Sequence, residues 1–245
     1  MKQLLLFGMV LILSACGSAG VSTPAPTPQA INIIYPAALQ PWADAITRCS
    51  SGNPQVALYF LHSEIVDTNV GPNDIILEFS NPGISSEGIY LSQVGWEQVV
   101  VVVNTENPVS QLSNAELKAI YSGQATNFDS DAGQPFQLWV LPDDEPTRLI
   151  FDLAVMQNQL ISTEAMLAPS PVAMLEAVSQ NRFAIGYLPG SFLTAGEPSF
   201  TSKLKIIQLE SSIEDLLHQP VVAITQAEPQ GFLRSLLVCL EAKSP

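Results

Sequence analysis

The sequence predicts an α/β fold, with a mostly parallel sheet covered by helices on both faces, for most of its 245 residues. Segments typical of strands alternate with segments whose apolar residues recur at helical spacing, the pattern of strand–helix–strand units. Gln98–Val103 is apolar without alternation, as expected for a strand buried on both faces. Ser113 and Glu116 form an S-x-x-E capping box before a helix, and Gly123 follows as a stop.

The chain begins with a short apolar segment, Leu4–Leu13, preceded by Lys2. It is too short to cross a bilayer as a helix and has the length of a secretory signal core. It ends in Leu13-Ser14-Ala15-Cys16, which resembles the lipobox of bacterial lipoproteins, where cleavage before the cysteine leaves a diacylated N-terminus. We therefore expect residues 1–15 to be a signal peptide and Cys16 to be lipidated. The alternative is a free or disulfide-bonded cysteine after an ordinary signal.

Residues 16–29 contain three prolines and no charged residue, and such a segment cannot bury enough surface to order itself. We expect a flexible tether that holds an extracytoplasmic domain on the bacterial membrane, in the periplasm or on the outer cell surface. The two remaining cysteines, Cys49 and Cys239, would lie in an oxidising compartment. They form either a disulfide between the first and last helices or two buried thiols.

The folded part is expected to begin at Ala30. Helices are predicted by apolar spacing from Leu39 to Cys49, by the capping box near Ser113, by Pro146 in a first turn, by Ser170-Pro171, and by the leucines after Phe232. Strands are predicted at Ala30–Tyr35, Val56–Leu61, Asp74–Phe79, Gly88–Leu91, Gln98–Val103, Phe136–Leu141, Phe183–Tyr187, Leu204–Leu209 and Pro220–Thr225.

Charge and motif content exclude several classes of function. The chain has 9 Lys and Arg against 23 Asp and Glu, a net charge of −14, so nucleic-acid binding is not expected. Only His62 and His218 could serve as histidine bases, and no motif of a hydrolase, zinc enzyme or nucleotide-binding loop surrounds them. Asp143-Asp144-Glu145 is the one dense group of carboxylates, and we interpret it as a helix cap with solvated charges rather than a metal site. Asp143 or Asp144 is the expected N-cap acceptor. We predict no enzyme activity, cofactor or metal.

Several motifs in the middle of the chain occur in a fixed order. After the hydrophobic strand at Gln98–Val103 they are Asn104, Asn107-Pro108, Leu112, Leu117, Tyr121-Ser122-Gly123, Thr126-Asn127-Phe128, Thr147-Arg148-Leu149-Ile150-Phe151 and Ile185-Gly186-Tyr187. In this order they resemble the phosphate-binding lipoproteins of ABC transporters, in which a hydrophobic strand precedes Asn and Asn-Pro, a Leu-x-x-x-x-Leu helix, an aromatic-Ser-Gly turn and a Thr-Asn-aromatic turn. A Thr-Arg-x-x-Phe helix start and an Ile-Gly-Tyr strand follow in that family.

The resemblance implies a two-lobed periplasmic-binding-protein-like fold of type II, with a ligand cleft between the lobes and helix N-termini that grip an anion. One lobe would comprise residues 30–105 and 190–245, and the other residues 106–189. The implied partners are a small ligand, an ABC permease and the membrane through the lipid, and we expect a monomer. The implied ligand-binding residues are Ala37, Ala38, Ser80, Thr126, Thr147, Arg148 and Tyr187.

The chain departs from the family pattern where an anion would be held. Pro36-Ala37-Ala38 lacks the family's hydroxyl groups, Glu145-Pro146 replaces Ser-Gly, and the family's strand-end arginine falls at Leu141. Arg148 either turns into the cleft or pairs with nearby acids on the helix surface, and Tyr187 is either a cleft wall or a structural aromatic. The family resemblance predicts solute binding for an importer. The departures at the anion site leave open an alternative, a sensor or interaction lipoprotein with a degenerate ligand site.

Overall fold

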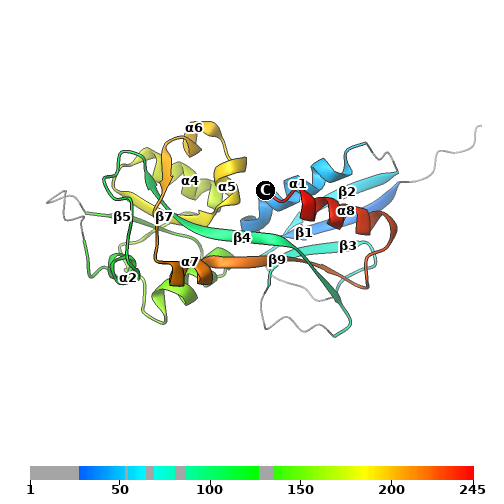
Figure 1. The fold of residues 1–245 in the computed structure, drawn as a ribbon, viewed down its shortest axis with the longest axis horizontal. Coiled ribbons are helices and arrows are strands. Elements are labelled where there is room, and N and C mark those ends of the chain that lie inside the picture. The colour runs from blue at the N-terminus through cyan, green and yellow to red at the C-terminus, as the bar shows by residue number, and fades with distance from the viewer. Residues whose placement is uncertain (1–27, 53–54, 65–68, 81–86, 127–134) are drawn as a thin grey trace, which may run out of the picture.

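The computed structural model describes residues 28–52, 55–64, 69–80, 87–126 and 135–245. They form an elongated molecule whose two lobes lie end to end and are joined by long strands (Figure 1). The expected signal peptide, Cys16 and nearly all of the expected tether lie outside the described residues. Within those residues, no helix is both long and apolar enough to cross a membrane.

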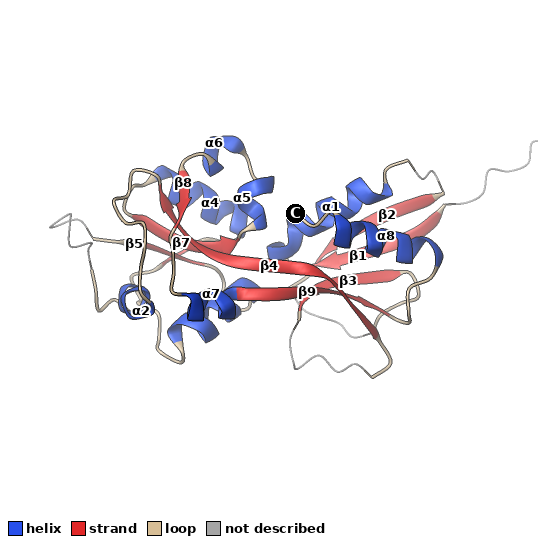
Figure 2. Ribbon diagram, viewed as in Figure 1, coloured by secondary structure: helices blue, strands red, loops and turns tan. Residues whose placement is uncertain are grey.

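The first lobe comprises residues 28–98 and 218–245, and it contains both ends of the described chain. Two helices, α1 and α8, lie next to each other over one face of its sheet (Figure 2). The elements of this lobe are β1 (Gln29–Tyr35), η1 (Ala37–Leu39), α1 (Gln40–Ser50), β2 (Val56–His62), β3 (Asp74–Phe79), the first part of β4 (Tyr90–Asn104), β9 (His218–Thr225) and α8 (Gly231–Ala242).

The second lobe comprises residues 99–217 and surrounds the other half of β4. Its capped helix is confirmed, because Ser113 accepts a hydrogen bond from the Glu116 amide and the Glu116 side chain bonds back to the Ser113 amide. The further elements are α2 (Asn114–Tyr121), β5 (Gln137–Val140), α3 (Pro146–Phe151), η2 (Asp152–Met156), β6 (Met166–Leu167), α4 (Pro171–Gln180), β7 (Ala184–Pro189), α5 (Ser191–Ala195), α6 (Pro198–Thr201), β8 (Leu204–Ile206) and α7 (Ser211–Leu217).

The described strands form one sheet in the order β2-β1-β3-β9-β4-β7-β5-β6, with β8 beside β4. Pairs are parallel in the outer part of each lobe, as the sequence predicts. Every pair that involves β4 or β9 is antiparallel, because these two strands run in opposite directions through the middle of the molecule. The sheet is therefore mixed, and its antiparallel centre connects the two lobes.

One long strand, β4, replaces the two strands expected at Gly88–Leu91 and Gln98–Val103. Its first part pairs with β9 up to Gln98, and its second part pairs with β7 from Val99 onward, so the chain crosses between lobes inside this strand. The pairing with β9 shifts register between Gln93 and Gly95. A side chain at Gly95 would come within 2.5 Å of the Trp42 ring, so this residue must be small where α1 packs on the strand.

The expected lobe boundaries need correction. Phe192, Ile207 and Ile213, which were expected in the first lobe, are buried in the hydrophobic core of the second lobe. The chain therefore returns to the first lobe only at His218, where β9 begins beside Gln98. Apolar residues in α5, β8 and α7 pack onto the second core, and this packing decides to which lobe the segment belongs.

Each lobe has its own hydrophobic core. The first core lies between the sheet and the pair α1 and α8, and it includes Trp42, Leu77 and Leu240. The second core surrounds Val99–Val103, which is buried on both faces as the sequence predicts. A side chain at Gly186 would lie 2.4 Å from the Met174 sulfur, so this glycine lets α4 approach β7 closely.

A disulfide joins Cys49 in α1 to Cys239 in α8. The two residues are separated by 190 positions in the sequence, and their Cα atoms lie 5.8 Å apart. Of the two alternatives that the sequence left open, the structure contains the disulfide. It connects the two helices that cover the first lobe, and the loop that it closes contains the entire second lobe.

A buried glutamate connects the lobes where β4 crosses between them. Glu97 is 4% exposed. Its Oε2 accepts a hydrogen bond from the Trp42 indole Nε1 of α1 at 2.8 Å, and its Oε1 accepts one from the Ser191 amide of α5 at 3.1 Å. The Gln98 amide also donates to Oε1, at 3.2 Å. These donors come from both lobes, so the Glu97 carboxylate ties the lobes together at the crossing.

Candidate functional site at the junction of the lobes

The first half of the candidate site is the start of the first helical segment, directly after β1. The Ala37 amide donates a hydrogen bond to Glu64 Oε1 at 3.0 Å. Glu64 follows the end of β2, and β2 runs parallel to β1, so the ends of both strands reach the same edge of the sheet. His62 Nε2 lies 2.8 Å from the same oxygen. The other oxygen of Glu64, Oε2, is buried and has no hydrogen-bond partner within the described residues.

The second half of the site is the start of α3 in the second lobe. Glu145 is the N-cap, and Pro146 occupies the first position of the helix. The Glu145 carboxylate accepts hydrogen bonds from the Thr147 hydroxyl at 2.9 Å and the Arg148 amide at 3.0 Å. Glu145 is 2% exposed and Thr147 is fully buried. The sequence favoured Asp143 or Asp144 as the cap, and this expectation is wrong because Glu145 accepts the helix's own hydrogen bond.

The two halves interact electrostatically across the junction. Burial raises the pKa of Glu145 to about 7, the bonds from Thr147 and Arg148 act in the opposite direction, and the charge of Glu64 raises it further. Burial also raises the pKa of Glu78 in β3 to about 7; the Phe79 amide opposes this shift, and Glu64 adds to it. The charge of Glu64 therefore acts on both Glu78 and Glu145, and we call these three residues the junction carboxylates.

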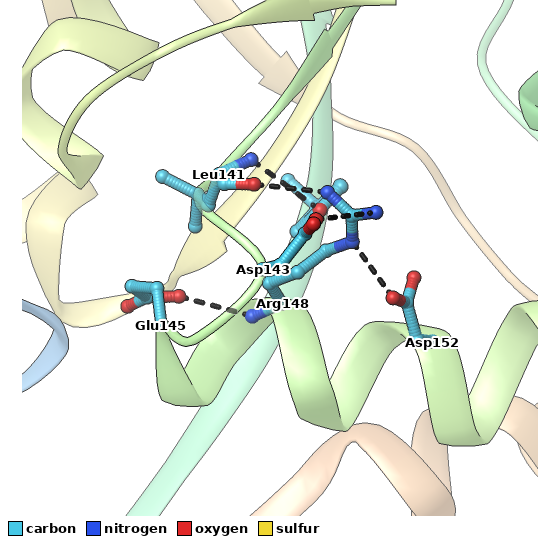
Figure 3. Close-up of polar contacts among 6 residues, drawn as sticks. Leu141, Asp143, Glu145, Arg148 and Asp152 are labelled. Atoms are coloured by element: carbon cyan, nitrogen blue, oxygen red, sulfur yellow. Dashed lines mark hydrogen bonds and ion pairs between the residues drawn. The ribbon is translucent and has the colours of Figure 1, made fainter. Parts of the chain in front are cut away.

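The Arg148 side chain does not supply a positive charge on the side where Glu145 lies. Its Nε lies 2.8 Å from Asp152, its Nη1 donates to the Leu141 carbonyl at 2.9 Å, and its Nη2 lies 3.2 Å from Asp143. Figure 3 shows the guanidinium group and the Glu145 carboxylate on opposite sides of the start of α3. Of the two alternatives for this arginine, the structure contains the ion pairs with nearby acids.

Tyr187 belongs to the core of the second lobe rather than to a ligand site. Its ring stacks on Phe151 with centroids 3.9 Å apart and planes 3° apart, and Tyr121 packs edge-on against Phe151. Tyr187 is fully buried, and the Leu141 amide donates to its hydroxyl oxygen. Of the two alternatives that the sequence left open for Tyr187, the structure contains the structural aromatic, so Tyr187 is not among the ligand-binding residues.

The other expected ligand residues are dispersed. Ala38 is fully buried in the first core, so only Ala37 of the alanine pair offers an amide to the junction. Ser80 is exposed, and its amide donates to the Pro220 carbonyl. The Thr126 carbonyl accepts a hydrogen bond from the Phe136 amide, so Thr126 lies beside the start of β5. The start of α3 follows the other end of that strand, so Thr126 and the start of α3 are at opposite ends of β5.

Two of the junction carboxylates, Glu64 and Glu78, were not predicted from the sequence. Glu64 follows a predicted strand and Glu78 lies inside one, and neither belongs to a motif. Glu78 lies between Leu77 and Phe79 in a largely apolar strand, and an acid in such a position was the one available signal of a special environment. Among the described residues, no three His, Cys, Asp or Glu side chains are grouped in a way that could hold a metal ion.

Comparisons with known proteins identify the family. A model described as a PBP superfamily domain matches residues 78–230, more than half of the chain. A Bacillus subtilis relative named phosphate-binding protein PstS is 24% identical over 215 residues, which cover 78% of this chain and 70% of the relative.

Solved structures share the fold. A phosphate ABC transporter substrate-binding protein from Clostridium perfringens, crystallised with phosphate, superposes with a TM-score of 0.70 at 17% identity, over 86% of this chain and 93% of the other. The OxyR regulatory domain of Pseudomonas aeruginosa superposes with a TM-score of 0.60 at 12% identity, over 89% of this chain and 100% of the other. The two-lobed α/β fold expected from the family resemblance is confirmed, and the chain belongs to the PBP superfamily.

Proposed function

We propose that this protein is an extracytoplasmic solute-binding lipoprotein of an ABC-type importer. The observation that carries the proposal is a two-lobed fold in which the chain crosses twice between the lobes, with a helix start in each lobe, at Ala37 and at Glu145, and with the charge of Glu64 acting on Glu145 from the other lobe. Two lobes joined in this way can close around a small ligand without any chemical step. The closed form would then be presented to a membrane permease.

The comparisons support the transport role. The Bacillus subtilis relative is named for phosphate binding, and the Clostridium perfringens structure is described as a transporter substrate-binding protein. A small ligand and a permease are therefore the partners that we propose, and no catalytic step is part of the proposal.

The proposed ligand binding is tested by thermal unfolding of the purified protein with phosphate, sulfate, molybdate, amino acids or sugars at millimolar concentration. A ligand that binds only the folded state stabilises it by about 2.7 kcal/mol at a concentration 100-fold above its Kd. At least one ligand class is expected to raise the unfolding temperature. If none does, solute binding is not the function.

The proposed lipid anchor rests on the sequence around Cys16. Cells that express the full chain and are fed labelled palmitate should incorporate the label into the wild-type protein and not into a Cys16→Ser variant. A Cys49→Ser variant is the matched control, because it also removes one cysteine and should keep the label. Label in the Cys16→Ser variant would contradict the anchor.

A second candidate function is a sensor or interaction lipoprotein on the same scaffold. It is favoured by one observation: the amides of Ala37 and Arg148 already donate to the protein's own carboxylates. This candidate predicts that the protein carries the lipid label but shows no shift of unfolding temperature with any ligand of the panel.

A further inference from the structure

We propose that β2 is a dimerisation edge, where it pairs antiparallel with β2 of a second copy of this chain. β2 lies at one end of the sheet, and among the described residues no strand pairs with its outer edge (Figure 2). The strand at the opposite end, β6, has two residues, whereas β2 has seven. A very short end strand offers little to an incoming chain, but a long one is a template for pairing. β2 is therefore the end of the sheet that needs a cover.

The side chains of β2 are apolar and exposed on both faces of the sheet. Residues 56–61 contain no charged residue, proline or glycine. Tyr59 is 55% exposed, Phe60 38% and Leu61 49%. Successive side chains of a strand point to opposite faces, so both faces of this edge present apolar surface to water. Natural proteins protect a free edge with lysine, proline or a bulge, and β2 has none of these.

The backbone of β2 can accept a further strand. The Gln29 amide donates to the Gln55 carbonyl, and the Ser63 amide donates to the Tyr35 carbonyl. Because the N–H and C=O groups of a residue point to the same side and alternate along the strand, the odd-numbered residues here bond β1. The even-numbered residues direct their backbone groups to the open edge. The outward groups are those of Val56, Leu58, Phe60 and His62.

The charge distribution favours a second copy of this chain as the occupant. The chain has 23 Asp and Glu against 9 Lys and Arg, so most contacts between two copies would bring acids together. β2 contains none of these acids. An antiparallel pair centred on Tyr59 includes the whole strand, and the nearest acid along the chain, Glu64, then lies five residues from the axis in each copy. The two Glu64 residues would be roughly 33 Å apart, about four Debye lengths, so their repulsion is screened.

The proposed lipid anchor would bring two copies together at the membrane. The segment from Cys16 to Pro28 precedes Gln29, which is paired with Val56 at the start of β2. In the antiparallel pair the two Gln29 residues would be about 25 Å apart, given the rise along a strand and the spacing between strands. A segment of this length can span up to about 45 Å, so both anchors can reach the same bilayer. Only this co-anchoring depends on the proposed lipid, and the exposed edge does not.

Cysteine cross-linking of the full chain in cells tests the pairing. In the proposed register, the side chain of Tyr59 lies about 5 Å from that of Tyr59 of the partner subunit, within reach of a disulfide. A Tyr59→Cys variant should therefore form a dimer on a gel without reductant. A Leu61→Cys variant is the matched control, because this residue has similar exposure on the same face but would be about 13 Å from its counterpart. It should remain monomeric, whereas co-expressed Ala57→Cys and Leu61→Cys chains should cross-link to each other.

Two further variants separate backbone pairing from side-chain contact. Phe60→Pro and Phe60→Ala both remove the ring, but only proline removes an N–H group that points to the open edge. When each is combined with Tyr59→Cys, proline should lower the yield of cross-linked dimer at least about tenfold relative to alanine. Protease resistance equal to that of the wild type verifies that each variant is folded. Should the Tyr59→Cys variant fail to fold, sedimentation equilibrium of the purified wild type measures the dimer directly.

The expected outcome is a dimer band for Tyr59→Cys and for the mixed pair, and a wild type that sediments as a dimer. This dimer would replace the monomer that the family resemblance implies. The proposal is overturned if Tyr59→Cys gives no dimer, if Leu61→Cys gives as much, or if the cross-linked band has the mass of another protein. It is also overturned if the wild type sediments as a monomer at every concentration up to about 100 μM. Solute binding is measured separately by the ligand panel, so either proposal can fail alone.

Discussion

Two buried glutamates of similar exposure have opposite surroundings. Glu97, at the crossing between the lobes, accepts hydrogen bonds from three N–H groups that belong to α1, β4 and α5. Glu145, at the junction, accepts two hydrogen bonds from its own turn and faces the charge of Glu64. The comparison teaches that burial alone does not decide the role of a carboxylate. Donors from both lobes make Glu97 a structural link, whereas burial, with a smaller contribution from the charge of Glu64, raises the pKa of Glu145 to about 7.

The largest change in the free energy of unfolding should come from a change of pH, because Glu145 titrates near neutral pH in the folded protein. The folded-state pKa of Glu145 and of Glu78 is about 7, above the ordinary 4.5, so the folded state binds more protons than the unfolded state between these values. The stability that the protonated Glu78 and Glu145 contribute is therefore fully present below pH 4.5 and is lost as the pH rises through 7. Each group should contribute roughly 3 kcal/mol, measured by urea denaturation from pH 5 to pH 8.

A Glu145→Gln variant sharpens this prediction, because it removes one of the two titrating groups. Its stability should fall less steeply with pH than that of the wild type, and at pH 8 it should exceed the wild-type value. An equal slope in both proteins would show that Glu145 is ionised in the folded state throughout this range.

Removing Glu97 should have the next largest effect. A Glu97→Ala variant leaves the Trp42 indole and the Ser191 amide without an acceptor in a buried position. Unsatisfied buried donors and the lost charged hydrogen bonds should reduce the free energy of unfolding by about 3 kcal/mol. Urea denaturation measures the loss. A Glu228→Ala variant, which removes an exposed acid of the same lobe, should lose less than about 0.5 kcal/mol.

The smallest effect should come from the Thr147 hydroxyl. A Thr147→Val variant keeps the shape of a fully buried side chain but removes the donor to Glu145. The loss of stability should be about 1 kcal/mol at pH 8 and smaller at pH 5, because the donor mainly stabilises the ionised carboxylate. In a Thr194→Val control the lost hydroxyl donates to a backbone carbonyl, so the loss should not depend on pH. Equal losses at both pH values in the Thr147 variant would contradict this role.

Local signals predicted much of the fold. The capping box at Ser113, the Ser170 cap and the unalternating valines of β4 rest on short-range physics, and the structure contains all three. The length of β4 was not predictable in the same way. Gln93, Gly95 and Glu97 interrupt its apolar pattern, and the strand continues through them because β9 pairs with this part of β4.

The candidate site was less predictable than the fold. The replacement of the family's hydroxyl groups at Ala37 and Glu145 is visible in the sequence, and it indicated a changed anion site. The contact between Ala37 and Glu64 joins residues 27 positions apart, and only the parallel pairing of β1 and β2 brings them together. The stacking of Tyr187 on Phe151 likewise depends on how α3 packs against β7.

The disulfide between Cys49 and Cys239 has a consequence for limited proteolysis. Every peptide bond of the second lobe lies between the two cysteines, so a single cut there leaves both fragments covalently connected. A nicked molecule should migrate as one band on a gel without reductant and separate into two bands once thiol is added. Comparing the two gels would therefore locate a protease-sensitive loop between the cysteines or outside them, before any sequencing of fragments.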